Sequence, residues 1–397
     1  MKLVSRLVWM VLLLVAGSVQ AAPQGTLVII GGALRSDNAP VWERIVQLAG
    51  GKGARIAVFA SAAGRPQQAG ESNAQRLRSY GADAFVVPIA VKLAGTDYAA
   101  LADDPTLAAQ VRSAGGAYFA GGDQGRITKA LRRPDGSNTL VLDALWDMYR
   151  RGGVIAGTSA GAAVMSSTMF NDAKTVLATL KLGVNDGREI APGLGFIGND
   201  VFVDQHLLIR GRFARMLPAM LKKGYKLGIG IDENSALVVN ARRDMEVIGY
   251  KGCIVLDLSS ARSEPGKFNI SGVQISYLDS GDRYQLGTGA FTPSADKVNG
   301  RVDAASPGNR GEIFYADILG NTTVVDLMSR LIDSDQVDAI GLAFGRDKDG
   351  EADLGFEFRF SRTKDSAGFA SATSSAYSIH RLRLDVRPVK MRWPIYQ

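Results

Sequence analysis

The chain has 397 residues, of which 46% are hydrophobic and 21% are charged, and its formal net charge is +7. This composition excludes a largely disordered chain, and the length suggests about two or three domains. One cysteine excludes an intrachain disulfide and a cysteine-rich zinc site, and two histidines exclude a multi-histidine metal centre. The sequence has no block of lysine and arginine of the nucleic-acid-binding type, so no nucleic-acid partner is expected.

Residues 1–21 have the pattern of a secretory signal peptide. Lys2 and Arg6 precede an apolar run over residues 7–16, and small side chains follow before the expected cleavage point. The run is shorter than the ~20 residues that span a bilayer. We therefore expect a soluble mature chain outside the cytoplasm with no membrane contact after cleavage; the alternative is an uncleaved N-terminal anchor.

Short apolar segments alternate with helical patterns from residue 26 onward. Strands are predicted over residues 26–30, 55–60, 84–88, 117–120 and 153–156. Helices are predicted over residues 41–48, 69–80, 104–113 and 140–150. This alternation indicates an α/β fold with a doubly wound, mostly parallel sheet that helices cover on both faces. Functional side chains are then expected at the carboxyl ends of the strands.

The composition changes near residue 290. Residues 292–311 are rich in Ser, Asp, Gly, Pro and Asn, which is typical of a linker, and alternating polar and apolar residues beyond it predict antiparallel strands. We therefore predict an α/β domain over residues 22–290 and a smaller β-rich extension over residues 291–397. Residues 347–350 faintly resemble a calcium loop but lack its ligand spacing, so we assign no metal.

The strongest local motif is Gly157-Thr158-Ser159-Ala160-Gly161, which follows an apolar strand. A Gly-x-Ser-x-Gly turn between a strand and a helix holds its serine in a strained conformation and exposes the hydroxyl. Backbone N–H groups at the start of the following helix can stabilise an oxyanion. Ser159 is therefore a candidate nucleophile, and the alternative is an ordinary strand–helix turn with a capping serine.

A serine nucleophile needs a base, and His206, at the end of an apolar strand, is the natural candidate. His380, which lies in the C-terminal region, is interpreted as a surface residue. Asp232 and Glu233 end another apolar strand, and because successive strand residues point to opposite faces, only one of them can orient the base. Spacing does not choose between them, and Asp204 is a rival. The order serine, histidine, acid differs from that of the α/β-hydrolases.

Two further groups lie near these residues in the sequence. The backbone N–H groups of Gly122 and Asp123 could complete an oxyanion hole with that of Ala160, and the Gln124 amide could contact substrate. A set of guanidinium groups that could bind carboxylates follows His206; it consists of Arg210, Arg212 and Arg215. The alternative for this set is a solvated helix face.

Four motifs together resemble those of the cyanophycinases, which are serine exopeptidases related to dipeptidase E. These motifs lie at residues 121–124, 157–162, 204–215 and 230–234, in the family's order, and the resemblance covers about residues 25–290. It implies a fold akin to class I glutamine amidotransferases. It also implies hydrolysis of the poly-aspartate backbone of cyanophycin, in which arginine is joined to each β-carboxyl, with release of β-Asp-Arg.

The resemblance also implies residue roles. Ser159 becomes the nucleophile, His206 the base, and Glu233 rather than Asp232 the acid. The substrate-pocket positions of the family fall on Gln124, Asp204, Gln205, Arg210, Arg212 and Arg215. No metal or organic cofactor is implied, and a homodimer is suggested by the family alone. With its signal peptide the chain looks like the extracellular type, secreted or periplasmic in a bacterium.

Two other functions stay open at this point. One is an aspartyl dipeptidase that acts on soluble Asp-X peptides. The other is a non-catalytic polymer-binding protein that keeps the same fold.

Overall fold

The computed structural model describes residues 24–303, 305–345 and 350–392. The predicted signal peptide lies outside the described residues, as does most of the loop at 347–350. Within the described ranges, no helix has both the length and the apolar character needed to cross a membrane.

In the described part of the chain, nine strands form the first sheet, in the order β16-β15-β11-β10-β1-β5-β4-β2-β3. Their bounds are β1 (Thr26–Ile30), β2 (Arg55–Phe59), β3 (Asp83–Val87), β4 (Gly116–Phe119), β5 (Val154–Thr158), β10 (Ser235–Val239), β11 (Asp244–Gly249), β15 (Arg283–Gln285) and β16 (Phe291–Thr292). The five strands from β3 to β1 are parallel, and the remaining four are antiparallel. The five strands predicted from the sequence are therefore confirmed, and they form the parallel half.

Helices cover both faces of this parallel half. One face packs against α1 (Ala39–Leu48) and α2 (Pro66–Ser79). The other packs against α3 (Tyr98–Ala102), α4 (Pro105–Ser113), α5 (Gln124–Leu131), α6 (Leu140–Arg150) and α7 (Ala160–Ala163). In α1, for example, Val41, Trp42 and Ile45 are buried because they recur at helical spacing on one face. The predicted α/β layering is confirmed for this half.

A second, ten-stranded sheet was not expected. Its main path runs β17-β18-β19-β21-β14-β12-β9-β8, with β13 paired to β14 and β20 to β21. The bounds are β8 (Val201–Gln205), β9 (Leu227–Ile231), β12 (Cys253–Asp257), β13 (Arg262–Ser263), β14 (Ile270–Leu278), β17 (Phe314–Tyr315), β18 (Asp338–Ala343), β19 (Leu354–Ser361), β20 (Ala367–Ala370) and β21 (Tyr377–Lys390). The prediction of one mostly parallel sheet is thus wrong for β8 and β9, which pair with each other and with β12 instead of joining the first sheet.

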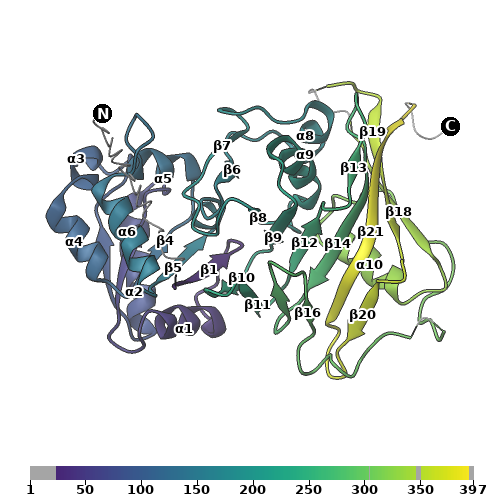
Figure 1. Cartoon of the computed structure of the whole chain (residues 1–397), viewed down its shortest axis with the longest axis horizontal. Coiled ribbons are helices and arrows are strands. Elements are labelled where there is room, and N and C mark those ends of the chain that lie inside the picture. Colours follow the sequence, from purple (N-terminus) through teal and green to yellow (C-terminus); the bar gives the residue numbers. More distant parts are fainter. Residues whose placement is uncertain (1–23, 304, 346–349, 393–397) are drawn as a thin grey trace, which may run out of the picture.

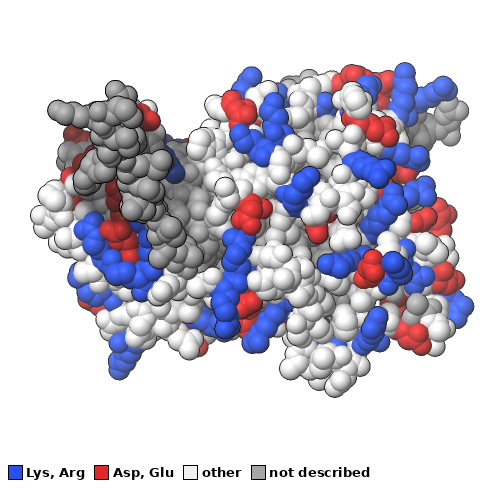
Figure 2. Space-filling model, viewed as in Figure 1, with Lys and Arg blue, Asp and Glu red and all other residues white. Residues whose placement is uncertain are grey.

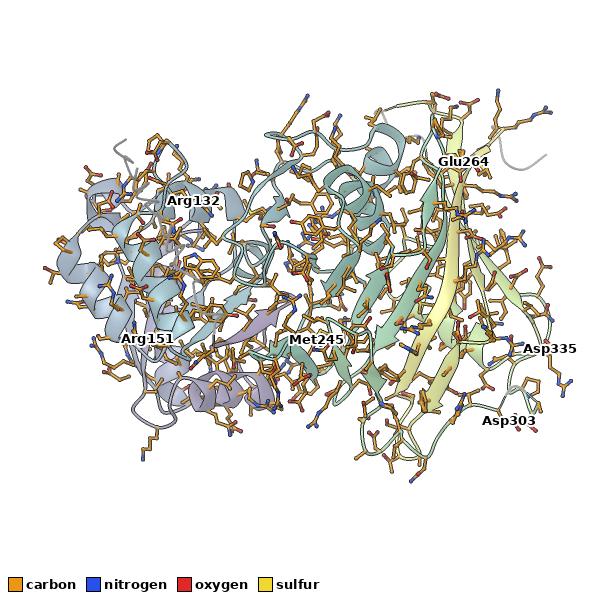
Figure 3. All side chains as sticks on the ribbon, viewed as in Figure 1. Arg132, Arg151, Met245, Glu264, Asp303 and Asp335 are labelled. Atoms are coloured by element: carbon orange, nitrogen blue, oxygen red, sulfur yellow. The ribbon has the colours of Figure 1, made fainter. Side chains whose placement is uncertain are left out.

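Three helices pack on one face of the second sheet: α8 (Val176–Leu182), α9 (Phe213–Lys223) and α10 (Thr323–Ile332). A short two-stranded sheet of β6 (Thr168–Phe170) and β7 (Ile190–Pro192) precedes β8 in the chain. Figure 1 shows the parallel strands of the first sheet with their helices in the left half of the view, its strands β10 and β11 near the centre, and most of the second sheet in the right half. Met245 of β11, labelled in Figure 3, belongs to a buried core to which both sheets contribute.

The second sheet runs across the predicted boundary at residue 290. Strand β14 pairs with β21 from Ile270↔Val386 to Tyr277↔Ile379. In addition, the buried Lys297 ammonium lies 2.9 Å from the carboxylate of Asp282. The C-terminal part is β-rich, as predicted, but it shares one sheet and one core with residues before 290.

His380 does not lie free on the surface as interpreted from the sequence. It is half-buried on β21, and its ring stacks on Phe291 with a centroid separation of 5.0 Å. Burial lowers the pKa of His380 to about 4, so the ring is neutral at physiological pH.

Candidate active site

Ser159 lies between β5 and α7 with φ 53° and ψ −110°, a strained conformation for a residue with a side chain. A Cβ on Gly157 would collide with the Gly161 carbonyl, and a Cβ on Gly161 would collide with that of Phe119. The two glycines thus permit the close approach of strand and helix. Because α7 has only four residues, its contribution to the site consists of N–H groups more than of a helix dipole.

Three side chains meet at the junction of the two sheets. The Ser159 hydroxyl lies 2.8 Å from His206 Nε2, and His206 Nδ1 lies 2.6 Å from Glu233 Oε1. Ser159 is half-buried, whereas His206 is buried with 7% of its surface exposed. With Nδ1–H donating to the carboxylate, Nε2 is left free to accept the serine proton. This is the geometry of a serine hydrolase.

Asp232 has a different position from its neighbour Glu233. Its carboxylate is fully buried and accepts the backbone N–H groups of Leu208 and Ile209 at 3.1 and 3.3 Å. Lys251 Nζ lies 2.9 Å from the other oxygen. Asp232 thus holds the turn that follows His206, while Glu233 contacts the imidazole itself.

The backbone of the segment Ile30-Gly31-Gly32, at the end of β1, is hydrogen-bonded to all three segments of the site. The Ile30 carbonyl accepts the N–H of Ser159 at 3.0 Å, and the Gly31 carbonyl accepts that of His206 at 2.8 Å. The Gly32 carbonyl accepts the N–H of Asn234, next to Glu233, at 2.8 Å. The sequence analysis did not identify this role, although a Gly-Gly pair at the end of a buried strand was a usable signal.

Gly32 supports a prediction about activity. Its φ is +114°, and a Cβ there would clash with His206 Cε1 and lie 2.5 Å from Nε2. Gly32→Ala should therefore displace the imidazole and lower kcat by about 100-fold, the scale of a misplacement of roughly 1 Å. The measurement is kcat on a soluble substrate, with the melting temperature recorded in parallel.

Gly53→Ala is the matched control, because Gly53 also has a positive φ (+79°) but no atom lies within 4 Å of its added Cβ. This variant should carry the backbone strain alone and keep its kcat. Equal losses of activity in both variants would show that strain, and not contact with the imidazole, is responsible.

The pKa of His206 is lowered from its ordinary value. Burial is the main cause, since it disfavours the charged imidazolium; Arg210 and Arg212 lower the pKa further, while the hydrogen bond to Glu233 opposes them. Because its pKa is lowered, the imidazole stays neutral at pH values at which an ordinary histidine is already protonated. It can therefore still accept a proton there.

This shift predicts the pH profile. With the neutral imidazole as the expected general base, kcat/KM should rise with pH through the folded pKa of His206, with a midpoint below 6.5. Arg210→Gln removes a positive charge that disfavours imidazolium, so the midpoint should move to higher pH. Arg55→Gln, a control at the exposed first residue of β2, should leave the midpoint in place. A midpoint that moves downward in Arg210→Gln would contradict the assignment of His206.

The predicted oxyanion donors differ in availability. A Cβ on Gly121 would lie 3.7 Å from Ser159 Oγ, so this turn borders the hydroxyl. Among the described residues, the N–H groups of Gly122 and Ala160 have no backbone acceptor. The Asp123 N–H already donates to the Ala62 carbonyl at 3.0 Å, and its side chain accepts from Gly125. Asp123 is therefore left out of the oxyanion site proposed below.

Asp204 and Arg215 form a buried pair beneath the site. Both oxygens of Asp204 accept from the guanidinium at 2.7 Å, and the side chains are only 2% and 6% exposed. Arg215 also lies over the ring of Phe170, 4.0 Å from its centroid, and the Phe170 carbonyl accepts the Gln124 amide at 2.7 Å. Neither charge of the pair faces solvent, so the expected direct substrate contacts of Asp204 and Arg215 are not supported. Sequence reasoning missed Phe170.

Two of the arginines remain near the surface. Arg212 is half-buried and donates to both the backbone carbonyl and the side-chain oxygen of Gln205, at 2.9 and 3.0 Å. Burial lowers the pKa of Arg212 to about 10. Arg210 is exposed. The three arginines of the predicted cluster thus differ in burial: Arg210 is exposed, Arg212 is half-buried and Arg215 is buried. Arg212 also holds the Gln205 side chain through a hydrogen bond.

Within residues 24–303, 305–345 and 350–392, no group of three or more His, Cys, Asp and Glu side chains is placed to hold a metal ion.

Comparison with known proteins identifies the family of the chain. The model of peptidase family S51 matches residues 27–246, more than half of the chain, and the chain therefore belongs to this family of serine-type peptidases. Its relatives include the cyanophycinase of Geminocystis herdmanii (strain PCC 6308), 29% identical over 276 residues, with 67% of this chain and 95% of the relative covered. The cyanophycinase of Synechococcus elongatus is 28% identical over 275 residues, covering 67% and 80%. The resemblance seen in the sequence is thus confirmed.

Among solved structures, a peptidase from an acI-B1 Actinobacterium matches with a TM-score of 0.49 and 20% identity, over 67% of this chain and 99% of that one. The expected likeness to glutamine amidotransferases is not confirmed by these comparisons.

Proposed function

We propose that this peptidase is a cyanophycinase that cleaves the poly-aspartate backbone of cyanophycin and releases β-Asp-Arg. The observation that carries the proposal is the pair of contacts from Ser159 to His206 and from His206 to Glu233, 2.8 and 2.6 Å, in a chain of family S51. The family match over residues 27–246 contains all three residues.

In the proposed reaction, the Ser159 hydroxyl attacks the carbonyl carbon of the scissile peptide while His206 Nε2 takes its proton. The N–H groups of Gly122 and Ala160 stabilise the resulting oxyanion. His206 then gives the proton to the leaving amine, and the peptide bond breaks to leave an acyl-enzyme on Ser159. Water, deprotonated by the same imidazole, releases the acid product and restores the hydroxyl. Glu233 keeps Nδ1 protonated throughout and stabilises the imidazolium.

The substrate pocket that we propose is smaller than the one expected from sequence. Arg210 is exposed and close enough to lower the pKa of His206, so it is available to the free carboxylates of the polymer. Arg212 and Gln205, which are hydrogen-bonded to each other, line one side of the proposed pocket. The polar amide of Gln124 lines its border. Asp204 and Arg215 act by positioning the turn that carries these groups. We also propose that the signal peptide directs the enzyme to the periplasm or the medium.

The test is to incubate the purified chain with cyanophycin granules and to identify the released products by mass spectrometry. Release of β-Asp-Arg supports the proposal. Hydrolysis of soluble Asp-X dipeptides without any release from cyanophycin would establish the aspartyl dipeptidase instead. Binding of the polymer with no product, and no labelling of Ser159 by a serine-directed phosphonate, would indicate a non-catalytic binding protein.

A further inference from the structure

One face of the second sheet carries a pattern of charge that the proposed active site does not use. Helices α8, α9 and α10 pack against one face of this sheet, where the apolar residues of β19 and β21 are buried. The alternate residues of β18, β19 and β21 point to the opposite face. Six of these, which we call the checkerboard face, are charged: Asp338, Glu357, Arg359, Arg383, Asp385 and Arg387.

Unlike charges adjoin one another on the checkerboard face both along and across the strands. Along β21 the order is Arg383, Asp385, Arg387. Across the sheet, Arg359 is paired in register with Asp385, and Glu357 with Arg387.

The charges of this face contact one another through ion pairs. Arg387 lies 2.9 Å from Glu357, and Arg383 3.0 Å from Asp385, while Arg359 lies 3.4 Å from Asp338. Figure 2 shows basic and acidic side chains interspersed over the right-hand part of the molecule, where β19 and β21 lie in Figure 1.

The three guanidinium groups and three carboxylates give the checkerboard face no net charge. A nucleic acid or an anionic membrane requires an excess of positive charge, so neither fits. The arginine side chains of these pairs are between 40% and 59% accessible, whereas the carboxylates range from 41% for Asp338 through 26% for Asp385 to 12% for Glu357. Exposed pairs of this kind are each worth about 0–1 kcal/mol. The three guanidinium groups and the Asp338 carboxylate are therefore the groups that can exchange their partners at little cost for those of a ligand that offers carboxylate and guanidinium groups together.

We propose that the checkerboard face docks the enzyme on a zwitterionic polymer that carries guanidinium and carboxylate groups in equal number. This inference rests on the proposed function, because each repeat of cyanophycin carries one free guanidinium and one free carboxylate. The face is separate from the catalytic centre, since β14 and β12 lie between β21 and β9, a spacing on the order of 14 Å. Docking would hold the enzyme on the solid and raise the effective concentration of cleavable chain ends.

The test uses the full chain with Ser159→Ala, which binds without degrading the granules, in a pelleting assay at fixed salt. The double variant Arg383→Gln/Arg387→Gln should reduce the bound fraction about tenfold, as expected when weak contacts of a multivalent surface are lost. The control is Arg55→Gln/Arg112→Gln, two exposed ion-paired arginines on the first half of the molecule, which should bind like the parent. Melting temperatures verify that each variant is folded.

A second variant separates a zwitterionic partner from a polyanion. Asp338→Asn/Asp385→Asn makes the face more positive, so it should weaken docking on cyanophycin, whereas it would strengthen binding to a polyanion. Equal pelleting of the parent, both face variants and the control would overturn the proposal.

Failure of docking and failure of the proposed function give different results. With Ser159 restored, the face variants should degrade granules several-fold more slowly than the parent but cleave a soluble oligomer of three β-Asp-Arg repeats at the parent's rate. If the parent cleaves neither substrate, the proposed function fails, and pelleting alone decides on the docking face.

Discussion

Ser159→Ala should lower kcat on cyanophycin by at least about 10³-fold while leaving the fold and the affinity for polymer intact. In the proposed mechanism, the hydroxyl supplies the atom that forms the acyl-enzyme. Removal of a serine nucleophile typically leaves only the residual catalysis of the oxyanion donors and of binding. The measurement is the initial rate of β-Asp-Arg release, together with the melting temperature.

The control for this variant is Ser167→Ala. Ser167 belongs to the same part of the chain, but its hydroxyl is bonded to Tyr225 at 2.7 Å and not to His206. It should retain near-parental kcat. Product release by Ser159→Ala at the parental rate would exclude the proposed mechanism, because His206 and Glu233 would then have no nucleophile to activate.

Removal of residues 291–397 should prevent folding of the rest of the chain. The truncation deletes β21, the partner of β14, and exposes a long hydrogen-bonding edge. It also removes Phe358, whose ring packs 5.8 Å from that of Phe213 on α9, and the remaining apolar residues of β19 and α10 from the shared core. At about 1.5–3 kcal/mol for each large side chain, this loss exceeds the 5–15 kcal/mol by which a typical domain is stable.

The measurement for the truncated chain is its yield in the soluble fraction, followed by circular dichroism and size-exclusion chromatography. A control chain that replaces the largely exposed tip at residues 371–376 with an equal length of Gly and Ser should fold and remain active. A truncated chain that is folded and active would show that the extension is a separate domain, as the composition change near residue 290 first suggested.

The segments of the candidate site could be picked out from the sequence because each has a strong local signal. Ser159 lies in a strand–Gly-x-Ser-x-Gly–helix sequence, and a chain with two histidines leaves few candidates for the base. The choice between Asp232 and Glu233 could not be made from spacing. Adjacent residues of a strand end point in opposite directions, and only the pairing of β9 between β8 and β12 decides which carboxylate faces the imidazole.

The arginines show a different limit. Arg210, Arg212 and Arg215 look equivalent in the sequence, but Arg210 lies in a turn, Arg212 precedes α9, and Arg215 is on the buried side of that helix. Only Arg215 lies within the helix, whose rotation of about 100° per residue turns its guanidinium inward to Asp204, whereas Arg210 lies in the preceding turn and stays exposed. The burial of Arg215 therefore depends on the packing of α9, to which β19 contributes through the contact of Phe358 with Phe213.

The sequence by itself determined the α/β order of the first half, the serine at the strand–helix turn and the β-rich character of the C-terminal part, because these depend on neighbours within a few turns. Only the tertiary structure decided that β8 and β9 leave the first sheet, that Ile30-Gly31-Gly32 holds all three site segments, and that charges on β18, β19 and β21 form one checkerboard. Strand pairing and burial bring together residues that lie up to hundreds of positions apart in the sequence. No local sequence pattern specifies which strands pair with each other.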